Sequence, residues 1–237
     1  IAGTLDSIVS MSKEAILDYF RSFYHPGNIV VSVAGNVSKE EVSRVVAEFF
    51  ETRESLDAKT FVPADTGEEG PRVAVETRDT KQANIVLGFP GYSRLHPSRY
   101  MLELLDVVLG QGMSSRLFQE VRVKRGLAYS VGSQYSPYQD TGLFRIYAGV
   151  DPERGEDAVK VILEQLERIR ETLITQDELR MAKDFYKGSL SLRLEDTLSL
   201  ALRHGGHMVL SGKIIPVEEV LERIEAVTAN EIQSVAG

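Results

Sequence analysis

The run GQGMSSRLFQEVRVKRGLAYSV, from Gly110 to Val131, is the stretch from which the rest of the chain is interpreted. A glycine loop leads into a segment with one apolar stripe, and period-two alternation follows. We expect a helix that begins near Ser114 or Ser115, whose hydroxyls can accept a hydrogen bond from a first-turn N–H. Gly126 should end this helix in a left-handed conformation. The run therefore predicts a loop, a helix and a strand in immediate succession.

Two polar side chains in this run are candidates for chemistry. Arg122 lies beside the apolar stripe of the helix, and Tyr129 lies in the strand. Because arginine keeps its charge in water and a tyrosine hydroxyl can donate, such a pair can hold a carbonyl oxygen or stabilise an oxyanion. The simpler interpretation is structural: Tyr129 alternates with Leu127 and Val131 as a core tyrosine would, and Arg122 is a solvated helix residue. Spacing alone leaves both interpretations open.

The pattern Gly-x-Gly-x-Ser-Ser-Arg-Leu-Phe-x-x-Val-Arg-x-x-x-Gly-Leu-Ala-Tyr-Ser-Val resembles the C-terminal half of the pitrilysin-type (M16) zinc metallopeptidases, which include the mitochondrial processing peptidases. In that family an arginine and a tyrosine at this spacing contact the substrate opposite the zinc. They match Arg122 and Tyr129, so the resemblance implies that these two are catalytic residues. Gly112, Ser114 and Ser115 of the same run are candidate substrate-binding residues.

Composition excludes several classes of protein. Of 237 residues, 43% are hydrophobic and 26% charged, as in ordinary globular proteins. The net charge of -8 argues against a nucleic-acid partner. No apolar run approaches the ~20 residues that span a bilayer, so we expect no membrane association. The absence of cysteine excludes a disulfide framework, a thiolate nucleophile and a cysteine zinc site, and fits a cytoplasmic location.

A polar stretch divides the chain into unequal parts. Residues 51–70 lose all periodicity and are predicted to be a linker. Residues 1–50 predict a helix from Ser12, a buried apolar strand over 28–34 and a second helix from Ser38. Because the chain begins at Ile1, we interpret residues 1–50 as the remnant of an upstream domain. Residues 71–237 then form the C-terminal peptidase-family domain.

The C-terminal part predicts an α+β fold, with an antiparallel-dominated sheet and helices packed mainly on one face, of the LuxS/MPP-like metallohydrolase type. Its strands are expected over 72–77, 84–89, 127–135 and 143–150, the last two as a hairpin. Its helices are expected over 97–109, 158–173, from Thr175, and over 196–210, 217–226 and 231–235.

A weak internal echo leads to a prediction about strand pairing. Residues 8–16 and 224–232 share an apolar residue before a hydroxyl cap and a helix start. This agrees with a family whose two domains are duplicates. We therefore expect the strand over 28–34 to join the sheet of the C-terminal part, within its own chain or by exchange in a homodimer.

Metal and anion chemistry have weak support. The His-x-x-Glu-His motif of inverted zincins is absent, and a catalytic zinc needs three protein ligands. His204 and His207 have ligand spacing but lack an acidic neighbour, so we assign no metal to them. A phosphate cradle at Gly110-x-Gly112 would need a preceding strand and a third glycine, and a sharp turn between helices is favoured. No Gly-x-Ser-x-Gly elbow is present.

The resemblance implies the C-terminal, substrate-contacting half of a zinc-dependent endopeptidase. Its partners would be a peptide substrate and an N-terminal zinc-binding half or partner subunit, with zinc in the parent and no cofactor in this chain. The alternative is a non-catalytic binding or assembly subunit of the same fold. A third and more distant interpretation is an anion-binding α/β domain built on the Gly110 loop.

Overall fold

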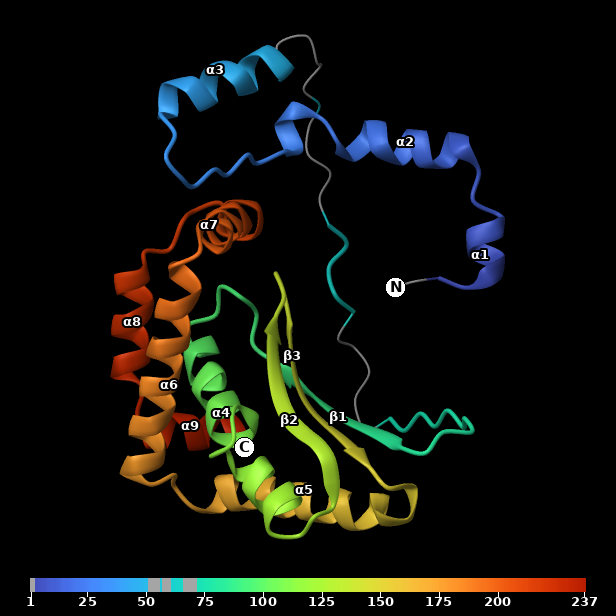
Figure 1. Cartoon of the computed structure of the whole chain (residues 1–237), viewed down its shortest axis with the longest axis vertical. Coiled ribbons are helices and arrows are strands. Elements are labelled where there is room, and N and C mark those ends of the chain that lie inside the picture. Colours follow the sequence, from blue (N-terminus) through green and yellow to red (C-terminus); the bar gives the residue numbers. More distant parts are fainter. Residues whose placement is uncertain (1–2, 51–55, 57–60, 66–71) are drawn as a thin grey trace. The chain divides into compact units, whose positions relative to one another are not determined.

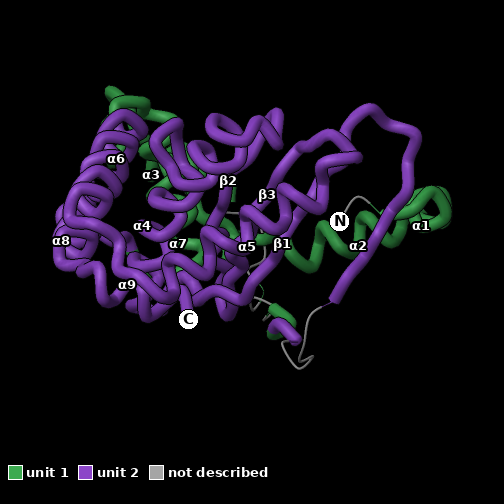
Figure 2. Tube along the Cα trace, turned by 90° about the horizontal axis from the view of Figure 1, so that it is seen from below, with its two compact units in different colours: residues 1–63, 195–213 green, residues 64–194, 214–237 purple. Residues whose placement is uncertain are grey.

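The computed structural model describes residues 3–50, 56, 61–65 and 72–237. The chain divides into two compact units (Figure 2): unit 1 comprises residues 1–63 and 195–213, and unit 2 comprises residues 64–194 and 214–237. Most of the predicted linker over 51–70 lies outside the described residues. The domain boundaries expected from the sequence therefore stay a prediction.

Unit 2 is built on a three-stranded antiparallel sheet. Its strands are β1 (Ala83–Gly91), β2 (Ala128–Pro137) and β3 (Gly142–Val150), in the order β1-β3-β2. β2 and β3 form the predicted hairpin, and β1 pairs antiparallel with the other edge of β3. Three of the four predicted strand runs are thereby confirmed.

The helices of unit 2 pack in two layers (Figure 1). Two of them contact the sheet, α4 (Arg99–Gly110) and α5 (Gly155–Glu171). The others pack against α4, α5 or one another: α6 (Gln176–Leu194), α8 (Val217–Ala226) and α9 (Ala229–Ala236). Alternate residues of β3, such as Ile146 and Ala148, are buried, whereas Tyr147 and its cross-strand neighbour Val86 are exposed. The predicted α+β fold is confirmed.

Glycine allows α4 to end against β2. A methyl group added at Gly110 would lie 2.0 Å from the backbone nitrogen of Ser133, a distance that no side-chain carbon tolerates. The same contact is reinforced by the Ser133 hydroxyl, which donates to Asp106 Oδ1 at 2.5 Å and to the Asp106 carbonyl at 3.1 Å. The end of α4, and with it the start of the Gly110 loop, is therefore fixed on the middle of β2.

The secondary-structure elements in the described residues of unit 1 are helices. They are α1 (Leu5–Val9), α2 (Lys13–Phe23), the 3-10 turn η1 (Pro26–Asn28), α3 (Lys39–Phe50) and α7 (Thr197–Ser211). Ser12 and Ser38 accept the hydrogen bonds of Ala15 N and Glu41 N, and Gly212 ends α7 at φ 67°. The predicted helix starts and the predicted end of α7 are confirmed.

Two predicted strands are wrong. Residues 28–34 and 72–77 are not assigned to any strand in the described part of the chain. Val73 and Val75 are 89% and 84% exposed, and Val30, Val31 and Val33 are also exposed. An apolar run becomes a strand only where a neighbour supplies backbone partners, and the described residues of unit 1 offer helices. Residues 28–34 do not join the sheet of this chain, so the duplication argument fails. Exchange in a homodimer stays a prediction.

The described helices include none that is both long and apolar enough to cross a membrane.

Candidate functional site

The helix after the Gly110 loop is a π-helix, η2 (Phe118–Val123). Lys124 N donates to Gln119 O at 2.9 Å, the five-residue spacing of a π-turn. Leu117 and Val121 are fully buried while Arg122 is exposed. The apolar stripe thus faces the core as predicted, but the α-helix expected there is wrong in type. π-turns are rare and occur often at functional sites.

The helix begins with an α-helical turn at Arg116, and Gln119 N donates to Ser115 O at 3.0 Å, so the predicted helix start near Ser115 is confirmed. Among the described residues no first-turn N–H donates to the hydroxyl of either loop serine, so the predicted side-chain cap is not formed. Ser115 is buried, and its hydroxyl donates backwards to the Gly112 carbonyl at 2.8 Å. Ser114 is exposed, and its hydroxyl has no hydrogen-bond partner in the part of the chain that the structure describes. Ser115 therefore shapes the loop, whereas Ser114 presents a hydroxyl to its surroundings.

Arg122 keeps its positive charge available. Glu120 pairs with the two basic neighbours of Arg122 instead, since its carboxylate lies 2.6 Å from both Lys124 Nζ and Arg125 Nη1. The Lys124 hydrogen bond, followed by that of Arg125, holds the pKa of Glu120 below its usual range. No carboxylate among the described residues pairs with Arg122, whose guanidinium lies 5.0 Å from the centre of the Phe118 ring. The ring holds this cation in place without cancelling it.

Tyr129 is turned outward by a β-bulge at the start of β2. Ala128 pairs with Val150 and Ser130 with the adjacent Gly149, so Tyr129 is the extra residue. It is 64% exposed, whereas Leu127 and Val131 are buried. The core-tyrosine interpretation is therefore wrong, because one inserted residue reverses the alternation on which it rested. Its hydroxyl makes no hydrogen bond to the described residues.

Hydrogen bonds fix η2 relative to β2. Gly126 adopts the predicted left-handed conformation at φ 57°, and its N–H donates to the Arg122 carbonyl at 3.1 Å. Leu127 N donates to Val121 O at 2.8 Å, and Arg154 donates to the Gly126 carbonyl at 3.0 Å. Arg122 and Tyr129 consequently project from two irregular elements joined by one short, fully bonded turn.

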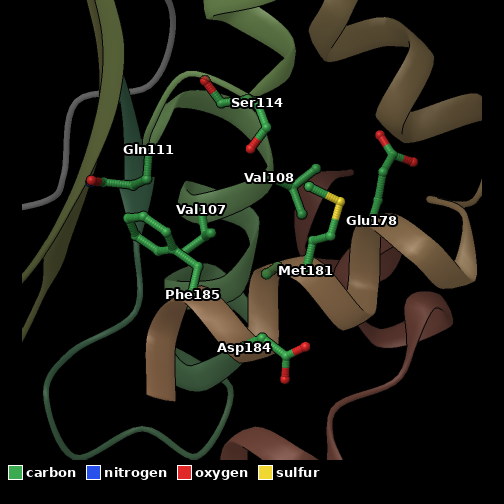
Figure 3. Close-up of a pocket in the computed structure, with 10 residues that line it drawn as sticks. Val107, Val108, Gln111, Ser114, Glu178, Met181, Asp184 and Phe185 are labelled. Carbon is green, nitrogen blue, oxygen red and sulfur yellow. The ribbon is translucent and has the colours of Figure 1, made fainter. Parts of the chain in front are cut away.

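The loop serines lie at a pocket of about 260 Å³ between the loop, α4 and α6 (Figure 3). An added methyl group at Gly112, where φ is 77°, would lie 3.4 Å from the Phe185 ring of the same pocket. Of the three predicted substrate-binding residues, Ser114 and Ser115 line this pocket, and Gly112 lies next to its Phe185 wall. Arg122 and Tyr129 do not line this pocket, whose walls are Val107, Val108, Gln111, Ser114, Ser115, Glu178, Met181, Ala182, Asp184 and Phe185.

Two polar contacts that support the loop were missed in the sequence. Arg116 forms a two-pronged ion pair with Glu178 of α6, with distances of 2.7 and 3.0 Å, and this pair holds the pKa of Glu178 below its usual range. Buried Asp106 accepts hydrogen bonds from Ser133 and from Gln111 Nε2, and its burial raises its pKa. An aspartate inside the apolar run Leu104–Leu109 was a usable signal. Arg116 and Glu178 are too distant in sequence to have given one.

The residues present do not fit a zinc site. Among the described residues, no group of three histidine, aspartate or glutamate side chains could hold a metal ion. His204 and His207 both lie on α7 without a third ligand. Catalytic zinc requires three protein ligands, and the described residues do not bring three together.

Comparison with known proteins gives one family. The family model described as the peptidase M16 inactive domain matches residues 10–186. An uncharacterized zinc protease of Streptomyces coelicolor is 38% identical over 242 residues, which cover 100% of this chain and 53% of that protein. One of Bacillus subtilis is 36% identical over 240 residues, covering 100% and 57%. The chain thus spans about half the length of these curated relatives.

Solved structures give the same fold. A protease from Helicobacter pylori superposes with a TM-score of 0.90 at 24% identity, covering 99% of this chain and 57% of that one. The peptidase M16 inactive domain from Pseudomonas fluorescens gives a TM-score of 0.83 at 23% identity, covering 98% and 55%. At these identities the likeness concerns the fold alone.

Proposed function

This chain belongs to the peptidase M16 inactive-domain family, as the Gly110 to Val131 run indicated, and from that membership we propose that it is the substrate-contacting half of a zinc-dependent endopeptidase. In this proposal Arg122 and Tyr129 grip a peptide carbonyl. The ligands for zinc would lie on an N-terminal half or a partner subunit, since the described residues offer no set of three. The names of the relatives, zinc proteases about twice as long, support the same division.

The observation that carries the proposal is the pair of backbone irregularities. A π-helix presents Arg122 and a β-bulge presents Tyr129, and neither side chain has a polar partner among the described residues. An exposed cation without a counter-ion and a hydroxyl without a partner contribute little to stability. Both are suited to a ligand that brings negative charge, such as a polarised carbonyl oxygen.

The chemistry of the two side chains is complementary. Zinc bound elsewhere would activate water for attack on the peptide carbon. As the carbonyl oxygen gains negative charge, Tyr129 would donate its hydroxyl proton into a hydrogen bond and Arg122 would supply a fixed positive charge. Both interactions strengthen toward the transition state, so they accelerate the reaction rather than merely retain the substrate.

Arg122→Gln in the longer protein tests the charge. We expect kcat on a quenched fluorescent peptide to fall by about 10² to 10³, the usual effect of losing one oxyanion-stabilising group, with a smaller change in KM. Arg180→Gln is the matched control, because Arg180 is an exposed arginine of the same unit whose ion pair among the described residues is with Asp177, three residues earlier. Equal rates for the wild type and Arg122→Gln would remove Arg122 from the mechanism.

The non-catalytic alternative makes a different prediction. A binding or assembly subunit of this fold would show no peptide hydrolysis by the longer protein, whatever occupies positions 122 and 129. A ligand set such as His-x-x-Glu-His in the N-terminal half of the longer protein, or in a partner subunit, would favour the peptidase.

A further inference from the structure

Two apolar side chains of α6 are left open beside the Gly110 loop. Met181 and Phe185 are one helical turn apart, 51% and 44% exposed, and both line the 260 Å³ pocket. Figure 3 shows Phe185 beside Val107 and Met181 beside Val108, so that α6 and α4 form two apolar walls. Removing such surface from water is favourable, and an apolar group that enters the pocket is therefore stabilised.

The side of the pocket nearest the loop is polar and unsatisfied. The Ser114 hydroxyl has no partner among the described residues. The Gln111 side chain donates through Nε2 to Asp106 at 3.0 Å, while its oxygen accepts no hydrogen bond from the described residues. The Ser114 hydroxyl can both donate and accept, so at the rim of an apolar pocket it matches an N–H or C=O group that flanks a peptide side chain.

We propose that this pocket is a specificity subsite that holds one apolar side chain of a peptide, such as leucine. The inference rests on the proposed function, since it assigns a second contact to the same substrate. Acidic side chains are disfavoured by the charge of Asp184, which lines the pocket and whose carboxylate has, among the described residues, only the distant partner Lys187 at 3.8 Å. Glu178 also lines the pocket, but Arg116 compensates its charge.

The position of the pocket suits a peptide that also reaches Arg122. Seven residues separate Ser115 from Arg122, and a helical rise makes their separation on the order of 10 Å. An extended peptide advances about 3.3 Å per residue, so the pocket would accept a side chain roughly three residues from the carbonyl at Arg122.

The size of the pocket favours a peptide over a folded partner. A stable protein interface buries about 800 Å² on each side and is broad rather than hollow. A cavity of 260 Å³ accommodates about one large side chain. A second copy of the chain, or the rest of a longer protein, would instead cover the exposed surface around it.

Methionine methyl NMR tests the subsite on the 237-residue chain. The sequence contains 5 methionines, which are Met11, Met101, Met113, Met181 and Met208. Titration with the capped peptide acetyl-Ala-Leu-Ala-Ala-amide should shift the Met181 signal and leave Met11 and Met208 of unit 1 in place. The same peptide with glycine or aspartate for leucine should bind about tenfold to a hundredfold more weakly. Equal responses to all three peptides, or equal shifts of Met11, Met208 and Met181, would contradict the subsite.

The substrate selectivity of the longer protein gives a second test of the subsite. Met181→Trp fills the pocket and should reduce the preference for leucine over glycine in kcat/KM by about tenfold or more. Leu192→Trp is the matched control, because Leu192 is a 70% exposed residue of the same helix that does not line the pocket. An unchanged preference in Met181→Trp would overturn the subsite even if Arg122 proves catalytic. A responsive Met181 signal in a protein without hydrolysis would overturn only the proposed function.

Discussion

Single residues decide the geometry of the candidate site. Tyr129 carries the alternation expected of a core residue, and the sequence contains no signal for the bulge that turns it outward. The reason is that register depends on the partner strand: Ala128 and Ser130 pair with consecutive residues of β3. The family pattern predicted a role for both Arg122 and Tyr129, and that role stays a prediction. Only the structure shows that Glu120 pairs with Lys124 and Arg125 and therefore does not act as a counter-ion for Arg122.

Gly110→Ala should be strongly destabilising. The added methyl group would lie 2.0 Å from Ser133 N and 2.4 Å from Ser133 Oγ, and the backbone contact cannot be relieved by a side-chain rotation. We expect a loss of about 2 kcal/mol or more in the free energy of unfolding. Gly188→Ala is the control: this exposed position in α6 has nothing within 4 Å of the added methyl, so stability should rise by about 0.5–1 kcal/mol. Urea titrations of both variants check the prediction, and equal effects would contradict the close packing of α4 on β2.

At the scale of elements, helices could be predicted better than strands. Hydroxyl and acidic caps are local signals, and Thr175 with Glu178 forms the predicted reciprocal pair at the start of α6. The runs 28–34 and 72–77 have strand composition but no ladder in the described residues. A helix satisfies its own backbone, whereas a strand depends on a partner that its own sequence does not specify. The sequence did not distinguish the π-helix η2 from an α-helix, because the buried residues Leu117 and Val121 also fit the apolar stripe of an α-helix.

The Arg116–Glu178 pair links the Gly110 loop to α6 and makes stability depend on pH. Because the folded state lowers the pKa of Glu178, chiefly through the Arg116 hydrogen bond, the pair stabilises the fold above the unfolded pKa of about 4.3. That stability is lost as pH falls through the folded pKa. Glu178→Gln should therefore reduce the free energy of unfolding at pH 7 by about 1 kcal/mol or more. The difference from wild type should shrink below about pH 4.

Glu48→Gln is the control for this measurement. Glu48 pairs with Arg44 at 3.1 Å on an exposed face of α3, where an ion pair contributes about 0–0.5 kcal/mol. Denaturation of both variants across pH 3 to 7 separates the two cases. A Glu178→Gln effect that is independent of pH would show that the carboxylate charge does not hold the loop.

In the whole protein, we propose that this chain binds the substrate and that residues outside it hold the zinc. We expect the 237-residue chain neither to bind zinc tightly nor to cleave peptides, because the described residues contain no three-ligand group. Dialysis against zinc followed by elemental analysis measures the first point, and a fluorescent peptide assay the second. Stoichiometric zinc that a chelator removes from His204 and His207, together with hydrolysis, would contradict this division of roles.

The most direct test of the central claim is kcat of Tyr129→Phe in the longer protein. Tyr129 is exposed and bonded to none of the described residues, so removing its hydroxyl should leave the free energy of unfolding within about 0.5 kcal/mol of wild type. Tyr138→Phe removes the hydroxyl of another exposed tyrosine, 52% exposed in the β2–β3 turn, and serves as the control. We predict that kcat falls by about 10² to 10³ in Tyr129→Phe and is unchanged in Tyr138→Phe. A folded Tyr129→Phe protein with wild-type kcat would contradict the claim that the bulge presents a catalytic hydroxyl.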